Sequence, residues 1–286
     1  MEESLTSLVS THWLSERLSD PSITVLDASK HLPAAKRDPR AEFAEGHIPG
    51  ARFLDLASLK DTGSSVPDAI PTHVQLMERL ALLGVAPDQT VILYDDSAVK
   101  TSARAWITFK TYGWERVAIL DGGLAKWRSE NRPLETGTHE TEGEPPTEVA
   151  ALAPVRIRSK VEMLANIDSQ GEQVLDARAA DRVFGDGVDP VHGGPNGRIP
   201  GALNLPFGQM FAPDGTYKSP SQLRAAFEDA GIDWQRPVVT TCGSGVTASV
   251  LLFAMHIAGK DDTALYDGSW SEWAADPDTP KAQGPQ

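Results

Sequence analysis

Short apolar runs alternate with longer segments of helical periodicity along the chain. The clearest pairs of apolar run and helical segment are residues 91–94 with 101–112, and residues 237–241 with 246–258. Gly113 and Gly259 follow the two helical segments, and glycine is the residue that most often ends a helix. Strands that alternate with helices predict an α/β fold, in which helices cover both faces of a mainly parallel sheet.

Four short motifs occur twice in the same order, which indicates a duplicated unit. The motifs are a run ending in Leu-Asp-Ala, Gly-x-Ile-Pro-Gly-Ala, the apolar run before residue 95 or 242, and a Gly-rich segment ending in tryptophan; their copies are separated by 149, 151, 147 and 146 residues. Four ordered matches at nearly one separation are the signature of an internal repeat. The chain is therefore expected to contain two copies of one fold.

A polar segment separates the two copies. Residues 133–154 are rich in Pro, Gly and Glu, a composition typical of linkers. We therefore expect an N-terminal domain at residues 1–136, a linker at 137–154 and a C-terminal domain at 155–286.

The first 18 residues predict an amphipathic helix after an acidic start. They lack the basic and apolar regions of a secretory signal, and no apolar run approaches the roughly 20 residues of a membrane helix. We expect a cytoplasmic protein with no membrane partner.

Composition removes several classes of function. The formal net charge of −14 argues against a nucleic-acid partner, because such partners bind a basic surface. One cysteine in 286 residues excludes an intramolecular disulfide and any cysteine-rich metal site. The seven histidines show no metal-binding spacing, so we expect neither a metal nor another cofactor.

That single cysteine, Cys242, has the surroundings of a nucleophile. It directly follows a predicted buried strand, and two glycines, Gly243 and Gly245, occur in the next three residues. Such a loop can turn tightly at positive φ and direct its N–H groups inward, and the next helix begins with Val246 and Thr247. Inward N–H groups and a helix N-terminus stabilise an anion such as a thiolate. The alternative is a small buried hydrophobic residue, which the flanking glycines disfavour.

The segments TCGSGVTA, GRIPGALNLPF, DAR followed by DRVFG, and LYDGSWSEW resemble the tandem rhodanese sulfurtransferases, and among them the 3-mercaptopyruvate sulfurtransferases. The resemblance covers nearly the whole chain. It implies two rhodanese-like domains, each a mainly parallel five-stranded sheet flanked by helices, with a catalytically silent first copy. Asp95 occupies the cysteine position of that copy, which agrees with such silence.

The resemblance also implies a reaction. The Cys242 thiolate would take sulfur from 3-mercaptopyruvate, release pyruvate and hold the sulfur as a persulfide. An acceptor thiol, such as thioredoxin or glutathione, or cyanide would then remove it. We expect a monomer.

The residues around the cysteine favour mercaptopyruvate as the sulfur donor. Thiosulfate-specific relatives place basic side chains directly after the cysteine, whereas here Gly243 and Ser244 are neutral. Arg182 matches the arginine that binds the substrate carboxylate in the family, and a planar carboxylate suits bidentate arginine. Ser244 is a candidate hydrogen-bond donor to the substrate or leaving group. Arg178 instead predicts a structural ion pair with Asp176.

Two features of the family are missing here. A second carboxylate-binding arginine would fall at Val191 or His192, and neither position holds an arginine. An Asp and a His of the first domain would fall near Ala57 and Asp68, so a Ser-His-Asp relay to Ser244 is not expected. The paired positions His47 and Arg198 are expected to be structural.

Three competing interpretations differ in chemistry. A thiosulfate sulfurtransferase is disfavoured by the neutral pair after Cys242. A phosphatase of the same fold needs an arginine six residues after its cysteine, where this chain has Ala248. A non-catalytic sulfur-binding module is disfavoured by the intact loop, and mass spectrometry of sulfur retained on Cys242 would distinguish it from an enzyme.

Overall fold

The computed structural model describes residues 6–138 and 155–284. They form two units: one contains the described residues of Met1–Thr62, Ile70–Pro154 and Ala212–Tyr217, and the other contains those of Gly63–Ala69, Val155–Phe211 and Lys218–Gln286. Most of the expected linker, residues 139–154, lies outside the described residues. The domain limits given above therefore stay predictions.

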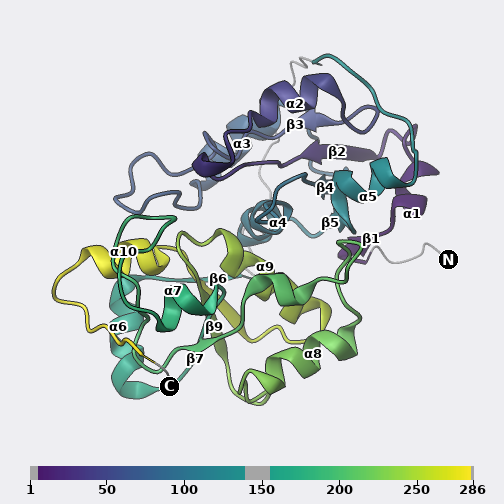
Figure 1. Cartoon of the computed structure of the whole chain (residues 1–286). Coiled ribbons are helices and arrows are strands. Elements are labelled where there is room, and N and C mark those ends of the chain that lie inside the picture. Colours follow the sequence, from purple (N-terminus) through teal and green to yellow (C-terminus); the bar gives the residue numbers. More distant parts are fainter. Residues whose placement is uncertain (1–5, 139–154, 285–286) are drawn as a thin grey trace. The chain divides into compact units, whose positions relative to one another are not determined.

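The first unit contains a five-stranded parallel sheet with strand order β1-β5-β4-β2-β3 (Figure 1). The strands are β1 (Leu8–Val9), β2 (Ile23–Asp27), β3 (Arg52–Phe53), β4 (Thr90–Tyr94) and β5 (Val117–Leu120). The helices are α1 (Thr11–Ser15), α2 (Pro39–Glu45), α3 (His73–Leu82), α4 (Ser102–Thr111) and α5 (Gly123–Ser129), with a 3₁₀ turn at Pro33–Ala35. Helix α4 packs against β4 and β5.

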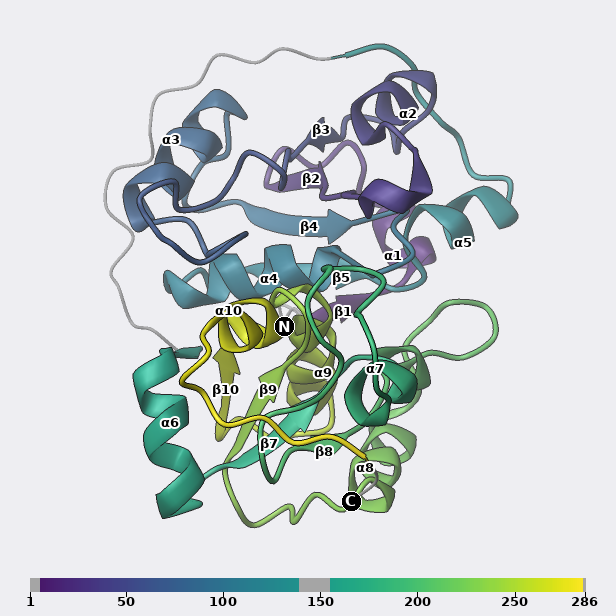
Figure 2. The same cartoon turned by 60° about the vertical axis from the view of Figure 1, so that its left-hand side comes forward.

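The second unit repeats this order as β6-β10-β9-β7-β8, again with parallel pairing (Figure 2). The strands are β6 (Arg156–Arg158), β7 (Gln173–Asp176), β8 (Leu203–Asn204), β9 (Val238–Thr241) and β10 (Thr263–Tyr266). The helices are α6 (Lys160–Ser169), α7 (Ala180–Phe184), α8 (Pro220–Asp229), α9 (Val246–Ile257) and α10 (Ser269–Ala275), with a 3₁₀ turn at Phe207–Met210. The predicted α/β fold with two parallel five-stranded sheets is thus confirmed.

The strongest periodic segments also form the predicted elements. The apolar runs become β4 and β9, which are buried along their whole length, and the helical segments become α4 and α9. Gly113 and Gly259 each follow the residue that caps the helix and adopt φ of 79° and 83°, a conformation that a side chain would disfavour.

The expected helix at the N-terminus is wrong in extent. Leu8–Val9 forms the edge strand β1, paired with Ile119 and Leu120 of β5, and only Thr11–Ser15 is helical. Because a two-residue edge strand is held by backbone pairing to a distant strand, its own side chains carry no periodic signal.

The duplication is visible in matching hydrogen bonds of the two cores. Trp127 and Trp273 are fully buried, and the indole Nε1 of each donates a 2.8 Å bond to the carbonyl of Pro133 or Pro280. His47 and Arg198 also occupy matching positions, and each forms an isolated antiparallel bridge with a later segment of its own copy. Both are buried, which supports the structural role predicted for them.

Candidate active site around Cys242

Cys242 lies at the carboxyl end of β9, in the four-residue connection that leads into α9. Strands β7 and β10 pair with β9 on either side, so the cysteine stands over the interior of the sheet rather than at its edge. Its side chain is 2% exposed. The carboxyl ends of parallel strands are where ligands bind in such sheets.

The two glycines of the loop serve different purposes. Gly245 has a φ of 77° and caps α9, as the sequence predicted. Gly243 does not have positive φ; instead, a Cβ atom built on it would lie 2.0 Å from Nε2 of His192. A side chain at position 243 would therefore have to displace the His192 ring, whereas the turn itself does not need glycine there.

Ser269 anchors the loop, although sequence reasoning did not single it out. Its Oγ accepts hydrogen bonds from the N–H groups of Cys242 and Gly245, at 3.2 and 3.1 Å, and donates to the carbonyl of Tyr266 at 2.8 Å. Ser269 is fully buried and has a φ of 51°, which is unfavourable for a residue other than glycine. The matching residue of the first copy is Gly123, with φ of 58°. The second copy therefore tolerates a strained serine whose hydroxyl holds the loop.

The backbone of α10 fixes the other side of the loop. The N–H of Trp270 donates to the carbonyl of Cys242 at 2.9 Å, and Ser271 donates to the carbonyl of Gly243 through its N–H and its Oγ, at 2.9 and 2.6 Å. These bonds engage the carbonyl groups of Cys242 and Gly243 with α10.

Four N–H groups of the loop have no hydrogen-bond partner among the described residues. They belong to Gly243, Ser244, Val246 and Thr247. Unpaired N–H groups at a tight turn and at a helix N-terminus form an anion-binding nest. The loop can therefore stabilise a thiolate or a persulfide anion on Cys242.

We predict that Ser269→Ala lowers sulfur transfer by about tenfold or more. The change leaves two buried N–H groups without an acceptor, each at a cost of about 1–3 kcal/mol. Ser269→Gly is the matched control, because it removes the same hydroxyl but relieves the positive φ. Both variants should lose activity in steady-state kinetics, while thermal melts should show the glycine variant as the more stable by about 1 kcal/mol. Full activity in both variants would show that the Ser269 hydroxyl is not needed to hold the Cys242 loop.

A buried carboxylate, Asp189, organises the basic side chains beside the loop. Arg182 of α7 donates from Nε and Nη2 to its two oxygens at 3.0 and 2.7 Å, and Nη1 of Arg178 lies 3.6 Å away. The N–H groups of Val191 and His192 also donate to Asp189, at 2.8 and 3.3 Å. Burial acts to raise the pKa of Asp189, but the bonds from Arg182 and Val191 outweigh it and hold the pKa below its ordinary value.

Arg178 forms the predicted ion pair. Its guanidinium donates to Asp176 at 2.7 Å, and both side chains are almost completely buried. The same guanidinium lies 4.8 Å from the ring centre of Trp270. Arg178 thus ties β7 to α10.

Arg182 keeps binding capacity after pairing with Asp189. Its side chain is 15% exposed, and the bonds to Asp189 use one Nε–H and one Nη2–H. Since a guanidinium carries five N–H donors, three remain without a partner among the described residues. The Nη1–Nη2 edge can therefore donate hydrogen bonds to a carboxylate. Ser244 is half-buried, and its hydroxyl has no partner among the described side chains.

His192 lies next to this arginine and against the loop. Partial burial of the ring and the charges of Arg182 and Arg178 lower the pKa of His192, whereas Asp189 and Asp68 act to raise it. Asp68 belongs to the segment Gly63–Ala69 of the same unit. The structure thus brings together His192 and Asp68, two positions at which this chain lacks the residue expected from the family.

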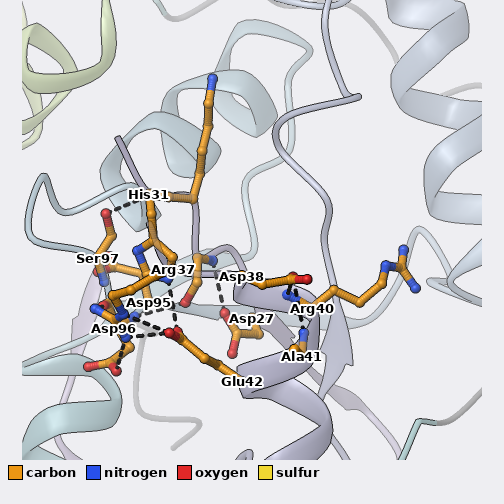
Figure 3. A network of polar contacts seen from close by, with 12 residues as sticks. Asp27, His31, Arg37, Asp38, Arg40, Ala41, Glu42, Asp95, Asp96 and Ser97 are labelled. Carbon is orange, nitrogen blue, oxygen red and sulfur yellow. Dashed lines mark hydrogen bonds and ion pairs between the residues drawn. The ribbon is translucent and has the colours of Figure 1, made fainter. Parts of the chain in front are cut away.

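The matching loop of the first copy is filled by its own carboxylate (Figure 3). The two oxygens of Asp95 accept from the N–H groups of Ser97 and Ser102, both at 2.8 Å. Arg37 then joins Glu42 to Asp96 across this loop, at 2.7 and 2.9 Å (Figure 3). The first copy places an acceptor where the second places a thiol.

Sequence reasoning missed Ser269 and Asp189 and gave His192 no role. The repeat held a signal for Ser269, because aligning the two tryptophan motifs sets it opposite Gly123. Asp189 and His192 lie between two matched motifs, in a stretch whose own sequence does not match the first copy, so only the fold reveals their contacts.

Two further searches bear on the kind of site. Across residues 6–138 and 155–284, no group of three or more His, Cys, Asp or Glu side chains is arranged to hold a metal ion. None of the helices described is both long and apolar enough to span a membrane.

Comparison with known proteins agrees with the fold. The Rhodanese-like domain family matches residues 10–130 and 159–276. The chain is 38% identical over 273 residues to the 3-mercaptopyruvate sulfurtransferase of Rattus norvegicus, covering 93% of this chain and 91% of that protein. It is 36% identical over 287 residues to the thiosulfate sulfurtransferase of Mus musculus, covering 97% and 96%.

A solved structure gives the same result. The crystal structure of SseA from Escherichia coli, a 3-mercaptopyruvate sulfotransferase, matches with a TM-score of 0.81 and 33% identity, covering 93% of this chain and 99% of that one. The chain belongs to the rhodanese-like family, which it contains in two tandem copies, and it is a sulfurtransferase.

Proposed function

We propose that this protein transfers sulfur from 3-mercaptopyruvate to a thiol or to cyanide through a persulfide on Cys242. The observation that carries the proposal is the buried thiol of Cys242 within a loop whose four unpaired N–H groups can surround an anion. No other cysteine occurs in the chain, so the sulfur has one site of attachment.

The reaction divides into two half-reactions. In the first, the Cys242 thiolate attacks the sulfur of mercaptopyruvate, an S–S bond forms, and the C–S bond breaks with its electron pair left on carbon. The pyruvate enolate then takes a proton. In the second, an acceptor thiolate or cyanide attacks the outer sulfur and releases the Cys242 thiolate. Kinetics of the ping-pong type follow from this sequence, and the loop N–H groups stabilise the anion at each stage.

The donor follows from the charges near the loop. Gly243 and Ser244 add no charge, and the positive charge of Arg182 is paired with Asp189. A monoanion such as mercaptopyruvate can bind the open edge of Arg182, whereas the described residues next to Cys242 in the loop, Gly243 and Ser244, offer the dianion thiosulfate no second cation. Relatives named for each donor have nearly equal identity, at 38% and 36%, so overall similarity does not discriminate between them.

The partners and surroundings of the reaction are also part of the proposal. We take the acceptor to be a small or protein thiol, of the glutathione or thioredoxin kind, with cyanide as an alternative acceptor. We take the protein to act as a monomer in the cytoplasm, with the first copy carrying no sulfur.

The direct test compares kcat/KM for mercaptopyruvate and for thiosulfate. The wild-type protein should favour mercaptopyruvate, and Ser244→Lys should raise the thiosulfate to mercaptopyruvate ratio about tenfold. A cation about 4 Å from the donor is worth up to about 4 kcal/mol at an effective dielectric near 20; about 1–2 kcal/mol surviving solvent screening gives that factor. Gly243 is left unchanged because a side chain there would displace the His192 ring and so alter a second group at the site.

Ser244→Gln is the control, since it adds length without charge and should leave the ratio of the two donors unchanged. Wild-type preference for thiosulfate would overturn the choice of donor. An unchanged ratio in Ser244→Lys would instead show that the loop charge does not select the donor.

A further inference from the structure

His192 is the side chain that links the nucleophile loop to the arginine pair. It lies in the connection between α7 and β8, where the residue as a whole is open to solvent and its ring is partly buried. Nevertheless, its Nε2 edge is turned toward Gly243, so closely that a Cβ atom there would lie 2.0 Å away. A ring that touches the residue after the nucleophile is in position to face a donor bound at Cys242.

One carboxylate holds both His192 and Arg182. The same oxygen of Asp189, Oδ1, accepts from Nε of Arg182 and from the N–H of His192, at 3.0 and 3.3 Å. Asp189 is fully buried. The backbone of His192 and the guanidinium of Arg182 are therefore held by one buried carboxylate.

Each arginine near His192 is paired with a buried carboxylate. Arg178 pairs with Asp176, and Arg182 pairs with Asp189. The charged groups that act on His192 are Arg182 from α7, Arg178 from the end of β7, Asp189 from its own segment and Asp68 from Gly63–Ala69. Among His192 and these neighbours, only the imidazole of His192 is of a kind that gains a positive charge between about pH 5 and 7.

We propose that His192 sets the charge of the sulfur-donor site and thereby the choice between a monoanionic and a dianionic donor. This inference rests on the sulfur transfer proposed above. An uncharged ring leaves a site that suits one carboxylate. A protonated ring adds the second cation that a dianion such as thiosulfate requires.

The direction of the pH effect follows. Partial burial and the neighbouring Arg182 lower the pKa of His192, so the ring is uncharged at neutral pH and gains its proton only in acid. Mercaptopyruvate should be favoured at neutral pH, and the preference should shift toward thiosulfate as the pH falls. Because the Cys242 thiol reacts with both donors, its own titration cancels in the ratio of the two.

The experiment measures kcat/KM for each donor from about pH 5 to 7.5 at constant ionic strength. In the wild-type protein, the thiosulfate to mercaptopyruvate ratio should rise about tenfold toward acid. His192→Gln should hold the low ratio at every pH, and His192→Lys should hold a high ratio at every pH. His256→Gln is the matched control, because His256 pairs with Asp261 at the end of α9; it should keep the wild-type profile.

The inference is overturned if the thiosulfate to mercaptopyruvate ratio of kcat/KM does not depend on pH in the wild-type protein. It is also overturned if that ratio still rises toward acid pH in His192→Gln. Failure of the proposed function looks different: the wild-type protein would then use thiosulfate and not mercaptopyruvate. In that case the role of His192 is tested by KM for thiosulfate alone. As the pH is lowered, this KM should decrease in the wild-type protein and stay constant in His192→Gln.

Discussion

Cys242→Ser should abolish sulfur transfer and the mass increase of one sulfur atom after incubation with the donor. Cys242 is the one cysteine of the chain, so no second thiol can take over. Serine keeps the position and hydrogen bonds of the loop, but its hydroxyl cannot form the S–S bond of a persulfide. Removing a nucleophile in this way costs at least on the order of a thousandfold in kcat. Intact-protein mass spectrometry and a pyruvate-release assay measure the two losses.

The matched control for this variant lies in the first copy. Asp95 occupies the position of Cys242 there, and Asp95→Asn keeps an oxygen to accept one of its two loop hydrogen bonds. This variant should still acquire sulfur at Cys242 and turn over. Appreciable pyruvate release by Cys242→Ser, with its fold verified by circular dichroism, would contradict the assignment of the nucleophile.

Arg182→Ala should lower kcat/KM for mercaptopyruvate by about 30- to 1,000-fold, mainly through KM. The loss corresponds to about 2–4 kcal/mol for a charge-assisted contact to the donor carboxylate. The free energy of unfolding should fall as well, because buried Asp189 loses the partner that donates to both of its oxygens. Steady-state kinetics and urea unfolding of the same preparation separate the two effects.

Arg156→Ala supplies the comparison. Arg156 is an exposed arginine at the start of β6 in the same unit, so its loss should change neither KM nor stability appreciably. If Arg182→Ala destabilises the protein while KM for mercaptopyruvate stays unchanged, Arg182 serves Asp189 and not the donor.

The features that were predictable from the sequence depend on neighbours along the chain. The strand, glycine loop and helix around Cys242 follow from an apolar run, Gly245 and helical periodicity within about twenty residues. The ion pair of Arg178 with Asp176 joins residues two positions apart. The N-terminal segment shows the limit of such reasoning, since Leu8–Val9 forms a strand only because β5 offers it backbone partners.

The sequence alone determined that this protein is a duplicated α/β chain with one thiol in a glycine-containing loop after a buried strand, because apolar periodicity, glycine positions and the cysteine count are local properties. The tertiary structure alone decided what surrounds that thiol. Ser269 reaches the loop from 27 residues away in the sequence, and buried Asp189 holds the side chain of Arg182 and the backbone of His192 together. These contacts depend on how separate strands and helices meet at one end of the sheet, and a buried carboxylate reveals its function only through the charges that the fold gathers around it.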